Sequence, residues 1–199
     1  PGCWNGFELA TRAIVGQLIS VDSATAIAGR IARKFGKPFA GAGKLTHLFP
    51  TPEVLSNADL GTVGLTKARA ETIRSLARAV CAGRIRFEGI VETSVFLARL
   101  REISGIGAWT AQFVAMRALG EPDAFPAGDL GLLRALNLTS SRELERRSEA
   151  WRPWRAYATM YLWNGSSEAK LKGTSRFARE SKTSFLKESG SRQVVSSIA

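Results

Sequence analysis

The sequence predicts an all-α fold, on two observations. Apolar residues recur at intervals of three and four along most of the chain, a spacing that places them on one face of a helix. No stretch alternates apolar and polar residues for long enough to indicate a sheet strand. With 199 residues, of which 45% are hydrophobic and 23% charged, the chain can bury one sizeable core or two small lobes.

The elements follow in order along the chain. Apolar stripes predict helices over residues 7–18 and 24–35. Thr66 has the side chain of an N-cap, so a long helix is predicted over Lys67–Cys81, stopping at Gly83. The other predicted helices are a short one opening at Pro52 and longer ones over 95–102, 108–119, 130–136, 142–150 and 153–163.

The composition changes abruptly after Trp163. Residues 164–199 contain nine Ser, seven Lys or Arg and three Asp or Glu, without a stable apolar period. We therefore expect a folded domain over 1–163 and a disordered, basic, Ser-rich tail over 164–199. Pro1 is not an initiator residue, so we expect the chain to be a fragment of a longer protein.

The chain is basic, with a net charge of +11, and residues 1–163 alone keep a surplus of seven positive charges. Lys and Arg release counterions from phosphates, so a polyanionic partner is expected, although a basic solvated surface has the same composition. No apolar run approaches the roughly 20 residues of a membrane span, and the first 20 residues lack signal-peptide features. We expect a cytoplasmic protein with no membrane partner.

The chain has two Cys and one His, too few for a disulfide framework, a four-cysteine zinc site or a four-cysteine iron–sulfur cluster.

The most informative segment is Leu100–Ala111, LREISGIGAWTA, which predicts a hairpin over about 100–112 between two helices. Its glycines let the backbone come close to a phosphate, and a positive φ is expected at such a position, Gly107 included. Ile103 and Ile106 are expected to fill the space beneath the turn. A plain helix-turn-helix packing unit is the alternative. The candidate phosphate-gripping positions are Gly105, Gly107 and Thr110.

A Gly/Pro-rich loop follows the hairpin and carries Asp129, 20 residues beyond Trp109. The whole pattern resembles the helix-hairpin-helix-GPD superfamily of DNA glycosylases, and more closely the bacterial 3-methyladenine DNA glycosylase II family. The resemblance covers about 163 residues and implies two helical lobes with the active-site cleft between them. The family's usual N-terminal β-rich domain is missing from the chain. The segments that carry the resemblance are 1–4, 7–20, 49–52, the hairpin, 125–131 and 151–163.

The resemblance implies a base excision repair enzyme that flips an alkylated, cationic purine such as 3-methyladenine out of duplex DNA and hydrolyses its N-glycosidic bond. Asp129 matches the family's catalytic aspartate, which stabilises positive charge on the deoxyribose. A carboxylate in a site of low dielectric stabilises such charge far better than water does. Asp is also a common helix N-cap, and the two roles are compatible.

Aromatic side chains match the family's base pocket. Trp109, Phe113 and Trp163 offer electron-rich faces to a cationic base, although aromatic residues at helical spacing are also ordinary core. Phe113 and Leu130 depart from the family pattern by standing where relatives carry Tyr. Trp109 occupies the position of the Lys nucleophile in related lyases, so no Schiff base can form there and simple hydrolysis is expected.

Gln17 and Leu18 match a minor-groove contact of the family, in which an apolar wedge fills the gap left by the extruded base. Leu18 also continues the first apolar stripe, so a core role is the alternative. No cofactor is required. A structural Na⁺ or K⁺ could bind the backbone carbonyls of Arg101, Ile103 and Ile106, as in relatives' hairpins.

Two other functions remain open. A non-enzymatic helix-hairpin-helix DNA-binding module would need the hairpin and the basic surface, but not Asp129 with its aromatic partners. A bifunctional glycosylase-lyase of the same fold would need the Lys that Trp109 replaces. The expected partner is double-stranded DNA containing damaged bases, bound by a monomer in the bacterial nucleoid.

Overall fold

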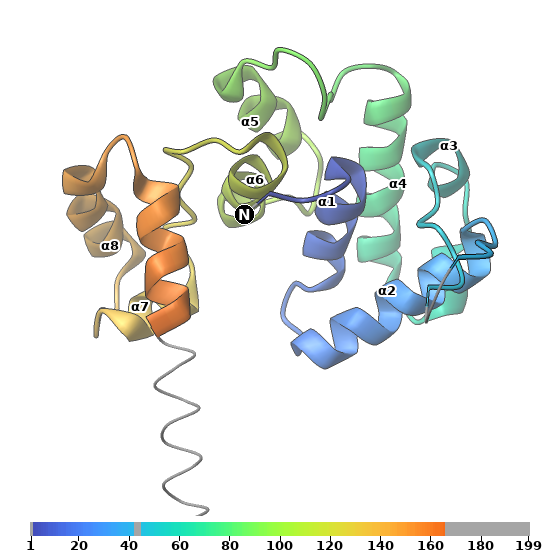
Figure 1. Ribbon diagram of the computed structural model, residues 1–199, viewed down its shortest axis with the longest axis horizontal. Coiled ribbons are helices and arrows are strands. Elements are labelled where there is room, and N and C mark those ends of the chain that lie inside the picture. The colour runs from blue at the N-terminus through green and yellow to red at the C-terminus, as the bar shows by residue number, and fades with distance from the viewer. Residues whose placement is uncertain (1, 42–44, 166–199) are drawn as a thin grey trace, which may run out of the picture.

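The computed structural model describes residues 2–41 and 45–165, and its described part is helical (Figure 1). A last helix covers residues 155–165. No strand is assigned within these two ranges, where Pro38 and His47 form an isolated bridge. The all-α prediction is confirmed. The helices are α1 (Gly6–Val15), α2 (Val21–Phe35), α3 (Pro52–Leu55), α4 (Lys67–Cys81), α5 (Thr93–Arg101), α6 (Ala108–Val114), α7 (Leu130–Ala135) and α8 (Ser141–Ser148), with shorter helical turns at Leu60–Val63, Ala115–Leu119 and Glu149–Trp151.

Helix α4 has the bounds and the cap that the sequence predicts, since the Thr66 hydroxyl accepts the Arg69 amide at 3.4 Å. The predicted helix over 108–119 keeps α geometry only to Val114 and then widens into a π-helical turn. The first predicted helix is too long by three residues. It ends at Val15, and Leu18 has a left-handed φ of 58° that no α-helix accommodates.

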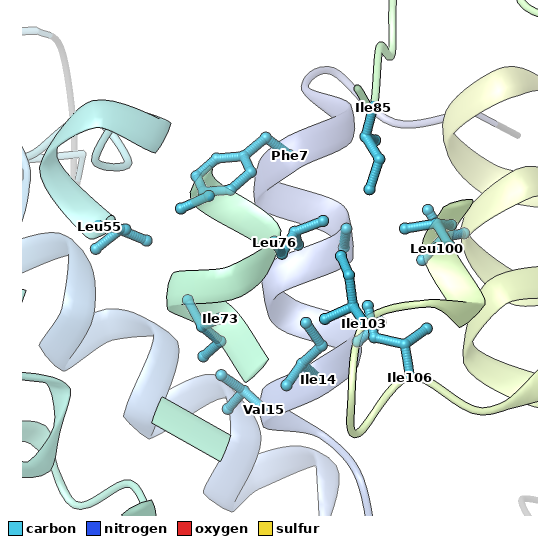
Figure 2. Close-up of a cluster of buried hydrophobic side chains, with 14 of the residues drawn as sticks. Phe7, Ile14, Val15, Leu55, Ile73, Leu76, Ile85, Leu100, Ile103 and Ile106 are labelled. Carbon is cyan, nitrogen blue, oxygen red and sulfur yellow. The ribbon is translucent and has the colours of Figure 1, made fainter. Parts of the chain in front are cut away.

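The larger of two hydrophobic cores lies around α1, which packs against α2, α4 and α6. Figure 2 shows buried side chains of this core from α1, α3, α4 and α5, together with Ile85, Ile103 and Ile106. Ile103 and Ile106 belong to this core, so the hairpin between α5 and α6 rests on buried isoleucines, as its sequence predicts. The position of the hairpin is therefore fixed by core packing.

A second, smaller core is formed by Phe125, Leu132 and Leu144. In Figure 1 the elements that carry it, α7 and α8, stand apart from α1–α5. The 155–165 helix joins the two cores, because Ala156 is buried in the first and Trp163 packs against both. The chain thus has two helical lobes.

An ion-pair network holds the segment that leads into α7. Arg155 donates to both Asp123 carboxylate oxygens, at 2.7 and 2.8 Å, and Arg152 pairs with the same carboxylate. Arg155 also lies over the Phe125 ring, 5.9 Å from its centroid. These contacts tie the start of the 155–165 helix to the chain just before Asp129.

The expectation of a disordered tail falls on residues 166–199, outside the described residues, whereas 164 and 165 belong to the last helix. Among the described helices, none combines the length and the apolar character needed to cross a membrane.

Candidate active site

Asp129 begins α7 as its N-cap. Its Oδ1 accepts the Leu132 amide at 2.9 Å, and its own amide donates to the Pro126 carbonyl at 2.9 Å. Asp suits this position because its short side chain reaches an amide that has no partner within the helix. The cap fixes where the carboxylate sits relative to α7.

Both tryptophans of the predicted pocket donate to this carboxylate. The indole Nε1 of Trp109 lies 3.1 Å from Asp129 Oδ2, and that of Trp163 lies 3.0 Å from Oδ1. A carboxylate has about four acceptor positions, so these two bonds and the Leu132 amide leave roughly one for water or substrate. The structure brings together residues of α6, of α7 and of the last helix at one carboxylate.

An aromatic cluster adjoins the carboxylate. The rings of Trp109 and Phe113 stack with centroids 5.3 Å apart and planes 10° from parallel, and Phe113 lies 6.2 Å from Trp163. All three side chains are only partly buried, so none of them is fully enclosed in a core. Leu130, next to Asp129, is 64% exposed. Phe113 and Leu130 contribute apolar surface without the hydroxyl of a Tyr.

The two hairpin glycines differ in conformation. Gly105 has a φ of +90°, and a Cβ there would lie 2.2 Å from the Thr72 hydroxyl. Gly107 has a φ of −83°, and a Cβ there would meet nothing within 4 Å. The expectation of a positive φ at Gly107 is wrong, because Gly105 makes the reversal and Gly107 is already extended as the N-cap of α6. Both glycines are exposed, and the space around Gly107 is open.

The other predicted DNA-contacting residues lie beside the hairpin. Gln17 Nε2 donates to the Gly105 carbonyl and to the Thr110 hydroxyl, each at 3.0 Å. Thr110 is 3% exposed, so its side chain serves this internal bond. Leu18 is 101% exposed, which makes its alternative core role wrong. The sequence does not predict that the side-chain amide of Gln17 donates to the hairpin.

The structure gives a hydrogen-bond partner for one of the three carbonyls predicted to bind a cation. The Ile103 carbonyl accepts the Ile106 amide at 3.0 Å, and a carbonyl oxygen keeps a second lone pair. The neighbouring carbonyls of Ser104 and Gly105 accept bonds from Thr72 and Gln17. No group of three or more His, Cys, Asp and Glu side chains within 2–41 and 45–165 is placed to hold a metal. The monovalent cation stays a prediction.

The hairpin, the loop that carries Asp129 and the helices on either side match one family model, described as HhH-GPD superfamily base excision DNA repair protein, over residues 11–155. The match spans most of the chain. The chain belongs to the HhH-GPD superfamily. The resemblance inferred from the hairpin and Asp129 is therefore confirmed.

Several curated HhH-GPD relatives are similar to the chain in sequence. A Mycobacterium tuberculosis protein named as a probable bifunctional transcriptional activator and DNA repair enzyme AlkA is 40% identical over 161 residues, which are 78% of this chain and 32% of the relative. Escherichia coli DNA-3-methyladenine glycosylase 2 is 32% identical over 166 residues, 82% of this chain and 58% of the relative. The chain thus spans 32% of the first relative's length and 58% of the second's.

Solved HhH-GPD structures have the same fold. A 3-methyladenine DNA glycosylase from Schizosaccharomyces pombe, in complex with abasic DNA, aligns with a TM-score of 0.68 at 25% identity and covers 81% of each chain. A 3-methyladenine DNA glycosylase from Archaeoglobus fulgidus aligns with a TM-score of 0.70 at 28% identity, covering 82% of this chain and 58% of the other.

Proposed function

We propose that the chain is a hydrolytic DNA glycosylase that flips an alkylated, cationic purine such as 3-methyladenine out of duplex DNA and cuts its N-glycosidic bond. The observation that carries the proposal is the Asp129 carboxylate, held by two indole N–H groups at the edge of an aromatic cluster. Relatives and solved structures named as 3-methyladenine glycosylases support it.

The site can supply both parts of this reaction. As the bond between C1′ and the base nitrogen breaks, its electron pair leaves with the base and positive charge develops on the sugar. Asp129 stabilises this charge, and water adds its oxygen to C1′ and loses one proton to solvent, which leaves a hydroxyl on the sugar. Alkylation makes the base cationic, and the faces of Trp109 and Phe113 attract it. Trp109 has no amine to form a Schiff base, so we propose hydrolysis without strand cleavage.

The DNA would be held in two places. The exposed hairpin backbone at Gly105 and Gly107 would grip phosphates, and exposed Leu18 would fill the gap left by the extruded base. One chain carries the carboxylate, the aromatic cluster and the hairpin, so we propose that it acts as a monomer. With damaged duplex DNA as its proposed substrate, we also propose that it acts in the bacterial cytoplasm.

A non-enzymatic DNA-binding module of the same fold is the second candidate. It would use the hairpin and the basic surface, but would not need a carboxylate held by Trp109 and Trp163. That arrangement favours an enzyme, because three donors on one carboxylate fix its direction.

A base-release assay on a panel of duplexes tests the proposal. Each duplex carries one lesion: 3-methyladenine, 7-methylguanine, hypoxanthine or 8-oxoguanine. We expect release of the two cationic purines, faster than that of the neutral bases, and intact DNA strands after the reaction. Specific binding with no base release from any duplex would favour the non-enzymatic module instead.

A further inference from the structure

The turn between α1 and α2 holds Leu18 in an unfavourable conformation. Its φ of 58° lies in the left-handed region, which is unfavourable for a residue with a side chain. The side chain is 101% exposed, so no burial of its own offsets this cost. The ends of the turn are bonded at 2.9 Å, from the Gly16 amide to the Arg12 carbonyl and from the Ala24 amide to the Ser20 carbonyl. The bonds on either side of Leu18 are longer, at 3.4 Å from the Gln17 amide to the Ile14 carbonyl and 3.5 Å from the Ile19 amide to the Gly16 carbonyl. A contact from outside the turn adds to these weaker bonds.

Arg69 of α4 supplies such a contact. Its Nη2 donates to the carbonyl of Gln17, which belongs to the peptide unit that joins Gln17 to Leu18. Rotation of that unit changes the φ of Leu18, so a donor fixed on its carbonyl fixes the direction of the Leu18 side chain. Arg69 is half-buried and comes from a long helix packed in the main core.

The same helix also holds the hairpin. Thr72, one turn after Arg69, donates its hydroxyl to the Ser104 carbonyl at 2.8 Å and lies directly against Gly105. The Gln17 amide bridges the two turns through the Gly105 carbonyl. Helix α4 therefore sets where Leu18 stands relative to the hairpin.

We propose that Arg69 is a positioning residue for base extrusion, acting through the backbone of the Leu18 turn and not through a contact with DNA. The proposal rests on the proposed glycosylase function and extends it. With Arg69 in place, the turn is already in the conformation that fills the gap, so the DNA need not supply the energy to form it.

The test compares two variants of α4. Arg69→Met keeps the aliphatic stem and removes the donors. Arg74→Met is the matched control, since Arg74 also donates to a loop carbonyl, that of Ala58 at 3.2 Å, away from the Leu18 turn. Both are assayed under single turnover with the alkylated purine that the unchanged chain releases fastest, placed once opposite its normal partner base and once opposite an abasic site.

A lesion opposite an abasic site is cheaper to extrude. Arg69→Met should slow release from the paired duplex by about tenfold, and from the unpaired duplex by about twofold or less, because the lost restraint matters only where extrusion is costly. Arg74→Met should slow both by the same small factor. If Arg69→Met slows base release from both duplexes equally, the proposal is overturned. A loss of affinity for undamaged duplex would also overturn it, because that loss would indicate a contact between Arg69 and a phosphate.

A double-mutant cycle with Leu18→Ala tests the route of the effect. If Arg69 acts through Leu18, Arg69→Met should change release by less than about twofold in a chain that already lacks the Leu18 side chain. Additive effects would overturn the proposal. An unchanged chain that releases no base contradicts the glycosylase function itself, whereas normal release with no selective effect of Arg69→Met contradicts only the positioning role.

Discussion

At the scale of single residues, the Asp129 carboxylate is defined by its donors. Two of them are tryptophans 54 positions apart in the chain, and both also belong to the aromatic cluster. One set of side chains thus orients the carboxylate and shapes the surface on which the extruded base would lie. A change of the ring and a change of the N–H group should have separable effects.

Trp163→Phe separates them, because it keeps an aromatic ring and removes the donor. Loss of a hydrogen bond to a charged group costs about 1.5 kcal/mol, so we expect single-turnover release of a cationic purine to slow by about tenfold. Trp151→Phe is the control, since Trp151 packs on Phe125 in the same lobe. Equal rates for the two variants would show that the indole bond to Asp129 does not matter.

Trp109 leads to a second residue-scale prediction. A lyase forms a Schiff base between an amine and the sugar, and borohydride reduces it to a stable adduct. With an indole at this position, borohydride added during the reaction should trap no covalent complex of protein and DNA. An adduct visible by denaturing gel electrophoresis would contradict hydrolysis by water alone.

At the scale of elements, the two hairpin glycines have different expected roles. Gly105 is required by the fold, and Gly107 is expected to contact DNA. Gly105 has a left-handed φ, and a Cβ at this position would clash with Thr72. Gly105→Ala should therefore lower the melting temperature. Gly107 is extended and open, so Val is tolerated there by the fold.

Gly107→Val should therefore lower the melting temperature less than Gly105→Ala does, since Val is only a poorer N-cap for α6, and should block the approach of a phosphate. We expect affinity for damaged and undamaged duplex to fall by similar factors of about ten, since lost phosphate bonds carry no sequence or lesion information. Fluorescence anisotropy at fixed salt measures both affinities. A well-folded Gly107→Val chain that binds undamaged duplex normally would make the hairpin a packing element.

Local sequence patterns predict some elements of the fold and not others. The period of apolar residues and the Thr66 cap are local signals, and they predict α4 to the residue. The α1–α2 turn escapes the same reasoning, because Leu18 continues the apolar stripe by spacing while its backbone is held outside the helix by Arg69. That contact joins residues 52 positions apart, a separation at which no local pattern gives a signal.

At the scale of the whole molecule, the 155–165 helix is the connection on which the site depends. It is anchored by Asp123 at its start and donates to Asp129 through Trp163 near its end. The sequence predicts Asp129 and its aromatic partners from the family motif, but the bonds between them depend on the packing of two lobes. Asp123 lies outside that motif, and its role becomes visible only in the fold.

Arg155→Met tests this anchor. The Arg155 side chain is 11% exposed and donates twice to Asp123, while Arg152 remains as a second partner. We expect the free energy of unfolding to fall by about 1–3 kcal/mol, measured by urea denaturation. Arg146→Met is the control, because Arg146 meets Glu143 only at 4.0 Å on an exposed face. Equal stability of the two variants would contradict an anchoring role.

Glu149 extends the network, since its carboxylate accepts a hydrogen bond from Arg152 at 2.8 Å, and this pair is sensitive to pH. The hydrogen bond from Arg152 lowers the pKa of Glu149 below its ordinary value. Because this pKa is lower in the folded chain than in the unfolded chain, the stabilisation is present above the ordinary value and is lost as the pH falls through the lowered one. The contribution of the Glu149–Arg152 pair to stability should therefore weaken in acid.

We propose that the Asp129 carboxylate performs the chemistry while the rest of the fold holds the DNA. Asp129→Asn keeps the shape and removes the charge. On a duplex with one alkylated purine, we expect this variant to bind as the unchanged chain does and to release base at least about a hundredfold more slowly under single turnover. Near-normal release by a folded Asp129→Asn chain would contradict the account.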